Sequence, residues 1–497
     1  MTVTRPIDGD AKTAADTAGV EHVDVKAVNR AEDRVLYKKR EKIFPKRARG
    51  NFRKLKWAVM AVTLAVYYLS PWLRWDRGPS APDQAILLDL PARRFYFFFI
   101  EIWPQEVYYL TGLLILAALA LFLVTSLAGR VWCGYTCPQT VWTDLFLAVE
   151  RFVEGDRSAR IRLDRAPWSA GKLVKRVVKH AIWLVIAVLT GGAWVFYFAD
   201  APTLALQLLN FEAPEVAYIT IAVLTGTTYL LGGLAREQVC TYMCPWPRIQ
   251  AAMIDEDSLI VSYHPGRGEP RGPMRKSESR EGKGDCISCN QCVVVCPMGI
   301  DIRDGMQLEC ISCALCIDAC NEVMDKVDLP RGLIGYDTIA NVARREKGET
   351  TKVRLIRPRT ILYAALIVLV GAIMLATLVT RADLDVNVLR DRNPIFVTLA
   401  DGSIRNGYTF KIINKKHEQR HFDLAIEGLP GAEIKLIGAA DGAPKFTVEP
   451  DRLASYRLYV LAPAAVAHGS VDFSFVLSDS GDGQQVRYDA TFRGPEK

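Results

Sequence analysis

Five apolar stretches constrain the fold of this 497-residue chain more than any other feature. They cover residues 57–73, 108–128, 181–199, 216–235 and 360–380, and none contains a charged side chain. About twenty such residues in a helix match the hydrocarbon thickness of a bilayer. The first stretch is the weakest, because Ser70 and Pro71 interrupt it near its end. The sequence therefore predicts an α-helical membrane protein with about five transmembrane helices.

The distribution of Lys and Arg predicts how these helices are oriented. Ten lie in residues 38–56, ten in 129–180, seven in 344–359 and none in 200–215. Cytoplasmic loops are enriched in Lys and Arg. We therefore expect a multi-pass membrane protein whose basic N-terminal segment (1–56) is cytoplasmic and whose 200–215 loop and C-terminal segment (381–497) lie on the other side of the membrane. The basic segment adjoins a span, so its charge indicates the membrane and not a nucleic-acid partner.

With this orientation all twelve cysteines lie on the cytoplasmic side. Four of them, Cys133, Cys137, Cys240 and Cys244, fall at the inner ends of the second and fourth spans, and the other eight lie within residues 236–359. Cytoplasmic thiols stay reduced, which favours metal binding or redox chemistry over a disulfide framework.

The eight form two copies of one motif, CISCNQCVVVCP from Cys286 and CISCALCIDACN from Cys310. With this spacing three thiolates of one run hold three corners of a 4Fe-4S cluster, and the fourth serves the other cluster. Zinc more often binds through two separated C-x-x-C pairs. We expect a two-cluster ferredoxin-like insert in residues 236–359. The predicted ligands are Cys286, Cys289, Cys292 and Cys320 for cluster 1, and Cys310, Cys313, Cys316 and Cys296 for cluster 2.

The remaining four cysteines lie in two matching motifs, WCGYTCPQ from Trp132 and VCTYMCPW from Val239. Each follows an apolar span, and Arg130 and Arg236 precede the two pairs at nearly the same offset. Residues 57–235 therefore look like a degenerate repeat of one helical hairpin. Cysteines one helical turn apart share a face, so four thiols can converge as a copper or redox site. The alternative is that they pack as small apolar residues.

Other cofactor sites are not indicated. The sequence contains no C-x-x-C-H, no histidine within a span, no G-x-G-x-x-G after a strand and no Walker loop. These absences argue against haem, nicotinamide, flavin and ATP sites. Electrons are therefore expected from a separate cytoplasmic donor.

The last segment follows the fifth span (360–380) and has a different pattern. Runs such as SYRLYVLAP and SVDFSFVLSD alternate apolar and polar residues between Gly, Pro, Asp and Asn turns. This pattern predicts an all-β immunoglobulin-like sandwich without the intersheet disulfide. We interpret the aromatic run Phe95–Glu106 as an interfacial segment and the polar region from Asp255 to Gly284 as a linker.

These motifs together resemble the cytochrome c oxidase accessory protein family, CcoG, also called FixG or RdxA. The likeness rests on the doubled cluster motif with GIDIRDGMQLECISC, the two C-x-x-x-C-P motifs, the five spans and the β tail, with Asn321 in place of the second proline. It implies two 4Fe-4S clusters on the eight cysteines named above. It also implies a bacterial inner-membrane location with the C-terminal segment in the periplasm. The implied role is in assembling cbb3-type cytochrome c oxidase by reducing Cu(II) to Cu(I), with oxidase subunits or other assembly factors as partners.

The expected function is therefore that of a membrane-bound electron-transfer protein that acts as a cupric reductase, with copper at Cys133, Cys137, Cys240 and Cys244. One alternative is a quinol-linked polyferredoxin similar to NapH-type proteins. Another is a non-enzymatic scaffold that acts through the sandwich. Membrane lipids are expected around the spans.

The orientation can be tested by reporter fusions. A reporter that is active only outside the cytoplasm should work when it is fused after residue 497, and it should be silent when it is inserted beside Gly268, because the positive-inside rule puts these positions on opposite sides. The reverse activity pattern would contradict the predicted orientation.

Overall fold

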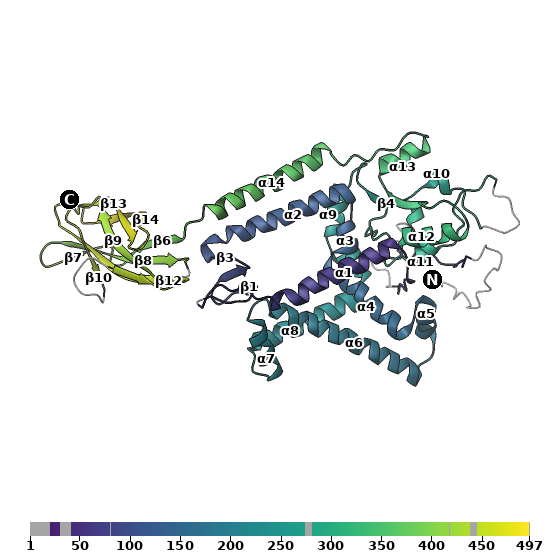
Figure 1. Ribbon diagram of the computed structural model, residues 1–497, viewed down its shortest axis with the longest axis horizontal. Coiled ribbons are helices and arrows are strands. Elements are labelled where there is room, and N and C mark those ends of the chain that lie inside the picture. Colours follow the sequence, from purple (N-terminus) through teal and green to yellow (C-terminus); the bar gives the residue numbers. More distant parts are fainter. Residues whose placement is uncertain are drawn as a thin grey trace. The chain divides into compact units, whose positions relative to one another are not determined.

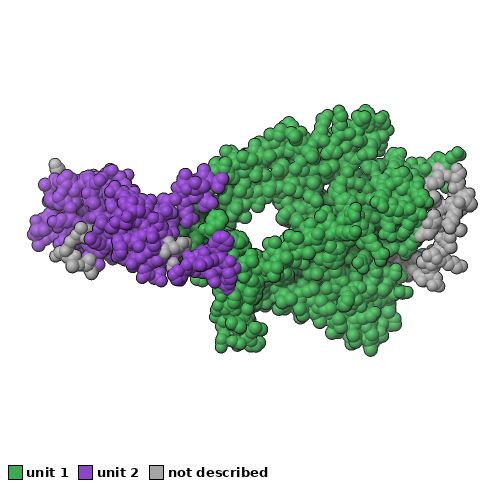
Figure 2. Space-filling model, viewed as in Figure 1, with its two compact units in different colours: residues 1–73, 85–374 green, residues 74–84, 375–497 purple. Residues whose placement is uncertain are grey.

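The computed structural model describes residues 20–29, 41–79, 81–273, 281–416, 418–437 and 445–496. Residues 1–19 and 30–40 of the predicted N-terminal segment, and 274–280 of the predicted linker, lie outside this part. The chain divides into two compact units, coloured in Figure 2. The first comprises residues 1–73 and 85–374, and the second comprises 74–84 and 375–497. All twelve cysteines belong to the first unit.

Four helical stretches in the described residues are long and apolar enough to cross a membrane: Pro104–Ala128, Ala170–Val195, Glu215–Ala235 and Pro358–Val379. They contain α2 (Tyr108–Ala128), α6 (Ala170–Val195), α8 (Glu215–Thr228) with the π-helix η3 (Tyr229–Ala235), and α14 (Pro358–Val379). Helix α6 begins well before the predicted position 181, because Lys172, Lys175, Arg176 and Lys179 form an amphipathic extension of its apolar part.

The first predicted span, 57–73, corresponds to α1 (Asn51–Leu69) and is not among these four stretches. Basic residues occupy its first turns, and the 3₁₀ helix η1 (Ser70–Trp72) follows it at Pro71. Helix α1 still extends beside α6 (Figure 1). The Tyr67 hydroxyl near its end donates to the Thr190 carbonyl at 2.7 Å. It is therefore a fifth helix of the bundle, and the predicted helical membrane fold is confirmed.

Glycines let these helices approach closely. A Cβ at Gly191 of α6 would lie 2.9 Å from the carbonyl oxygen of Ile221 on α8, and a Cβ at Gly233 of η3 would lie 2.9 Å from the Trp183 ring. Small residues at helix crossings permit the close packing that drives association in lipid. The other helices of this part are α3 (Val131–Tyr135), α4 (Pro138–Glu154), α5 (Arg157–Arg165), α7 (Ala201–Leu209), the π-helix η4 (Val239–Met243) and α9 (Trp246–Met253).

The aromatic run Phe95–Glu106 was interpreted above as an interfacial segment. In the structure it forms β-strands, which the sequence analysis did not predict. An antiparallel sheet contains β1 (Ile86–Asp89), β2 (Arg94–Phe97) and β3 (Ile100–Ile102), and the 3₁₀ helix η2 (Pro104–Glu106) follows it. The Leu88 N–H donates to the Tyr197 carbonyl at 2.7 Å, which attaches the sheet to the end of α6.

The cysteine-rich segment is closed by an antiparallel pair, β4 (Ile260–Tyr263) with β5 (Ile334–Asp337). Between these strands lie α10 (Pro265–Gly268), α11 (Gln291–Val294), the 3₁₀ helix η5 (Ile302–Asp304) and α12 (Leu315–Lys326), and α13 (Ile339–Glu346) follows β5. The Leu259 N–H donates to the Leu127 carbonyl at 3.0 Å. The segment is thereby attached to the end of α2.

The second unit contains the predicted immunoglobulin-like sandwich. One sheet has the order β10-β12-β8-β6 with β7 beside β8, and the other has the order β11-β9-β13-β14. Side chains such as Phe410, Phe446 and Phe475 are fully buried between them. The strands are β6 (Leu384–Arg390), β7 (Val397–Thr398), β8 (Ile404–Asn414), β9 (Arg420–Glu427), β10 (Glu433–Leu436), β11 (Lys445–Val448), β12 (Arg452–Ala462), β13 (Ser470–Asp479) and β14 (Gln485–Arg493).

Two carboxylates hold the basic start of α1 in the first unit. Asp318 of α12 accepts hydrogen bonds from the N–H groups of Phe52 and Arg53 at 3.2 and 2.7 Å, and so caps the helix. Asp144 of α4 lies 2.9 Å from Arg53 Nη1 and 3.9 Å from Lys56 Nζ, with all three side chains buried. Burial alone would raise the pKa of Asp144, but Lys56 and Arg53 hold it below its ordinary value.

Replacing this carboxylate should destabilise the first unit. Asp144→Asn leaves Arg53 and Lys56 buried without a counter-charge, which we expect to lower the free energy of unfolding by about 3–5 kcal/mol. Because the folded-state pKa of Asp144 is depressed, its stabilisation is complete above the ordinary carboxyl pKa and is lost as pH falls below it. The variant should therefore lose less stability than the unmodified chain on acidification. Thermal unfolding in detergent at several pH values measures both effects.

Asp156→Asn is the matched control. Asp156 is half exposed and lies 4.0 Å from Arg151, so its loss should change the free energy of unfolding by less than about 1 kcal/mol. Equal losses in the two variants would contradict the role assigned to Asp144.

Candidate metal and electron-transfer site

Each four-cysteine run forms a loop that leads into a helix. Cys292 lies on α11, and Cys316 and Cys320 lie on α12. The loops share one backbone geometry, because two residues in each have positive φ: Ser288 (57°) and Asn290 (59°), and Ser312 (52°) and Ala314 (60°). Such angles are uncommon for residues other than glycine. Their recurrence at matching positions shows that one loop structure is built twice.

The fourth cysteine of each run lies with the other group. Burial and the charges of Cys289 and Cys286 raise the pKa of Cys320 to about 12. Burial and the charges of Cys313 and Cys310 raise the pKa of Cys296 to about 12. The structure thus brings together the two sets expected from the spacing: Cys286, Cys289, Cys292 and Cys320, and Cys310, Cys313, Cys316 and Cys296. Ligation by these sets stays a prediction.

Both sets have the chemistry that an iron–sulfur cluster requires. Cys292, Cys296, Cys310, Cys313 and Cys316 line one small cavity whose other walls are apolar. Burial raises the pKa of Cys316 well above its ordinary value, and neighbouring thiolates raise it further. Four thiolates in such surroundings need a compensating cation, and a metal core supplies it. A bound cluster would supply one-electron redox chemistry.

The two sets are neighbours. Cys292 of the first set is among the thiols whose charge raises the pKa of Cys316 in the second, after burial and the second set's own cysteines. Burial also raises the pKa of Cys289 and Cys310, and the N–H groups of Gln291 and Ser312 offset part of that rise. Each of these backbone donors lies two residues after its cysteine and stabilises charged sulfur in one of the two loops.

Two features beside the first set were not predicted from the sequence. Arg303 opposes the effect of burial on the pKa of Cys292, and its guanidinium donates to Asp301 at 2.6 Å and to Asn290 at 2.8 Å. Residues 20–29 cross the same loop, where Asn290 Nδ2 donates to the Val23 carbonyl at 2.7 Å. The N-terminal segment therefore covers the first set. The polar composition of this segment carries no signal of that contact.

The two C-x-Tyr-x-C-Pro motifs follow one repeated turn. Gly129 after α2 and Arg236 after η3 have φ of 56° and 46°, and Cys133 and Cys240 each follow that turn by four residues. The structural counterpart of Arg236 is therefore Gly129. Arg130, at nearly the same offset from its cysteine pair, lies one residue after this counterpart. The second cysteine of each pair leads into a helix: Cys137 caps α4, and Cys244 precedes α9.

The four thiols of these motifs lie close together. Burial raises the pKa of Cys240 to about 12, with further contributions from Cys137, Cys133 and Cys244. Burial raises the pKa of Cys133 to about 11, opposed by Arg130 and reinforced by Cys137 and Cys244. Among the described residues, no group of three or more His, Cys, Asp or Glu side chains is arranged to hold a metal ion.

These thiols pack against the second set of cluster cysteines. Cys133 and Cys313 are buried in one apolar cluster, with Cys240 and Cys296 packed against it. A Cβ at Gly134 would lie 2.6 Å from the Ile311 carbonyl oxygen, so the first motif touches the second loop directly. The Tyr135 hydroxyl donates to the Cys313 carbonyl at 3.3 Å.

Arg130 and Gln250 are further residues of this junction. Arg130 donates to the Leu308 carbonyl, and its charge partly offsets the effect of burial on the pKa of both Cys133 and Cys310. The Cys133 thiol donates to Gln250 Oε1 at 3.1 Å. The sequence analysis identified Arg130 and Tyr135 as parts of a repeat, but it did not predict these contacts. No sequence pattern indicated that Gln250 would lie beside Cys133.

This combination of a helical membrane unit and a doubled four-cysteine motif defines a membrane-bound iron–sulfur electron-transfer protein. Family models agree with this class. Residues 235–339 match a 4Fe-4S dicluster domain, residues 110–153 match a 4Fe-4S binding domain, and residues 374–495 match the Ig-like fold at the C-terminus of FixG.

The similarity to known relatives extends over nearly the whole chain. This chain is 54% identical to the nitrogen fixation protein FixG of Rhizobium meliloti, over 96% of this chain and 98% of that protein. It is 54% identical to protein RdxB of Cereibacter sphaeroides, over 92% of this chain and 97% of that protein. The chain belongs to the FixG/RdxA family, which confirms the resemblance inferred from its motifs. The chain is also similar to a FixG-related protein from Vibrio parahaemolyticus whose crystal structure is known. The two sequences are 21% identical, the similarity covers 22% of this chain and 96% of that chain, and the TM-score is 0.20.

The crossed grouping predicts which cluster each cysteine supports. Cys296→Ala should remove about half of the bound iron by damaging the cluster held by Cys310, Cys313 and Cys316. Cys320→Ala is the matched variant, and it should damage the other cluster to a similar extent. Iron counting and electron paramagnetic resonance on the anaerobic proteins would distinguish the two. Loss of the same cluster in both variants would contradict the crossed grouping.

Proposed function

We propose that this protein reduces Cu(II) to Cu(I) for the assembly of a cbb3-type cytochrome c oxidase. The observation that carries the proposal is that the four thiols Cys133, Cys137, Cys240 and Cys244 lie close together, with Cys133 and Cys240 packed against the second set of cluster cysteines. Thiolates are soft ligands that favour monovalent copper. Copper held there would be stabilised in its reduced state beside a source of single electrons.

The electron balance of this reaction is simple. The clusters that the eight cysteines would hold would supply one electron for each Cu(II) ion that is reduced to Cu(I), and a separate cytoplasmic donor would replace that electron. Arg130 faces both Cys133 and Cys310, so its positive charge favours negative charge on either side of the junction. The C-terminal sandwich is the part proposed to contact oxidase subunits or other assembly factors.

The proposed orientation puts the cysteine-rich segment in the cytoplasm and the sandwich in the periplasm of a bacterial inner membrane. It requires an odd number of crossings. Helix α1 supports this count, since its start bonds to Asp318 in the cysteine-rich segment and its end to Thr190 on α6. The positive charges that weaken α1 as a span are matched by Asp144.

A further iron–sulfur centre is the alternative occupant of the four thiols. The match to a 4Fe-4S binding domain over residues 110–153 favours it, because Cys133 and Cys137 are the only cysteines in that range. Such a centre would extend the electron path without making copper the substrate.

Replacing one pair separates these possibilities. In Cys240→Ser with Cys244→Ser, the proposal expects iron content to stay normal while Cu(I) binding and the rate of copper reduction both fall at least about tenfold, because two soft ligands are lost. Serine nearly preserves the side-chain volume and so limits any packing effect. Iron per protein, Cu(I) per protein and the reduction rate are measured on the purified, cluster-loaded protein.

Met243→Leu is the control within the same motif. Its side chain is 62% exposed, so copper binding should not change. A fall in iron by about four atoms in the double variant would favour the further iron–sulfur centre. Unchanged iron, copper binding and reduction would show that the pair only packs the helix ends.

A further inference from the structure

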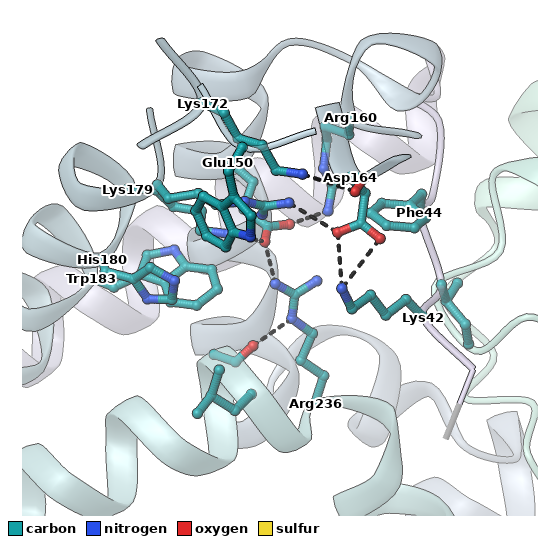
Figure 3. Close-up of a pocket in the computed structure, with 15 residues that line it drawn as sticks. Lys42, Phe44, Glu150, Arg160, Asp164, Lys172, Lys179, His180, Trp183 and Arg236 are labelled. Atoms are coloured by element: carbon teal, nitrogen blue, oxygen red, sulfur yellow. Dashed lines mark hydrogen bonds and ion pairs between the residues drawn. The ribbon is translucent and has the colours of Figure 1, made fainter. Parts of the chain in front are cut away.

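A cavity without cysteines lies in the first unit, where α5, α6 and the end of η3 meet the segment Lys42–Phe44 (Figure 3). Its volume is about 470 Å³. The predicted electron path does not use it, and no motif in the sequence marks it. Its charge, its position and one buried arginine together indicate a ligand.

The lining of the cavity is strongly cationic. Six lining side chains are basic and two are acidic: Lys42, Arg160, Lys172, Arg176, Lys179 and Arg236, with Glu150 and Asp164. Glu154 adds a third carboxylate, which lies 3.0 Å from Arg176 and 3.1 Å from Lys179. Three positive charges are left in excess. Since buried like charges repel one another, the cavity is suited to an anion.

Arg160 marks where the anion would bind. Its side chain is 1% exposed, and one of its nitrogens pairs with Glu150. Its Nε and Nη1 donors are buried without a hydrogen-bond partner among the described residues. Buried donors normally have partners. A guanidinium fork matches phosphate oxygens in geometry and charge.

The cavity lies beside the basic N-terminal turns of the membrane helix α6. Lys172, Arg176 and Lys179 lie on the first turns of α6, before the apolar part of that helix. Apolar side chains beside the cavity are exposed on η3: Leu234 lines the cavity and is 41% exposed, and Leu230, four residues earlier, is 53% exposed. Trp168 lines the cavity and is 75% exposed, as expected for a tryptophan at a membrane interface.

We propose that this cavity binds the phosphate of an anionic phospholipid headgroup. Arg160, Arg176 and Lys42 contact the phosphate, and the acyl chains lie along the exposed apolar side chains Leu230 and Leu234 of η3. Free phosphate shares the headgroup's chemistry but has no acyl chains to pack against these apolar side chains. Basic pockets beside membrane helices are a recurrent form of lipid recognition.

The test uses the full-length protein in a neutral detergent, titrated with phosphatidylglycerol or phosphatidylcholine while the thermal unfolding midpoint is followed. Phosphatidylglycerol should raise the midpoint saturably, and phosphatidylcholine should not. Arg176→Gln should weaken phosphatidylglycerol binding at least about five-fold. This variant leaves neither carboxylate partner without a cation, because Lys179 remains beside Glu154 and Lys42 beside Asp164.

Lys175→Gln is the matched control, because Lys175 is exposed on the same turn of α6 and does not line the cavity. It should bind phosphatidylglycerol like the unmodified chain. Lys42→Gln, on the other side of the cavity, repeats the test if Arg176→Gln does not fold. Equal effects of the two lipids, or equal losses in Arg176→Gln and Lys175→Gln, would overturn the proposal. Stabilisation by inorganic phosphate with no further effect of phosphatidylglycerol would overturn the lipid assignment.

Discussion

Asp318 determines how the cysteine-rich segment meets the membrane helices. It lies on α12 between Cys316 and Cys320, and it accepts the first N–H groups of α1. A side chain at Gly50 would collide with it, since a Cβ there would lie 2.3 Å from the Asp318 carboxyl. One carboxylate therefore fixes the start of a membrane helix to the helix that carries a cysteine of each set. Asp144 completes this junction by compensating the charges that α1 brings into it.

This attachment puts three groups of cysteines in a definite order. The first cluster set borders the second through Cys292 and Cys316, and the second borders the motif thiols through Cys313 and Cys133. Cys286, Cys292 and Cys320 lie in a different apolar cluster from Cys133. Single electrons could therefore pass along the groups in sequence, with the motif thiols at one end. Cys133, Cys286, Cys292, Cys313 and Cys320 are buried, so the few cations near them have a strong electrostatic effect.

Arg236 links two parts of the first unit. Its backbone has φ of 46°, which is strained for a residue other than glycine. Its guanidinium pairs with Glu150 and donates to the Gly233 carbonyl at 2.7 Å, and these contacts hold the strained turn in place. The residue lines the cationic cavity and also a smaller cavity that contains Cys240.

The sequence by itself determined the spans, the two cluster motifs and most strands of the sandwich, because each depends on a local pattern. Apolar length predicts α2 and α14, cysteine spacing predicts the crossed sets, and alternation predicts strands such as β12 and β13. The tertiary structure alone decided that Asp144 compensates Arg53, that Gly134 touches Ile311, and that residues 20–29 cover the first set. Each of these contacts joins residues far apart in the chain. No local pattern encodes them, because they depend on the paths that whole helices take through the packed unit.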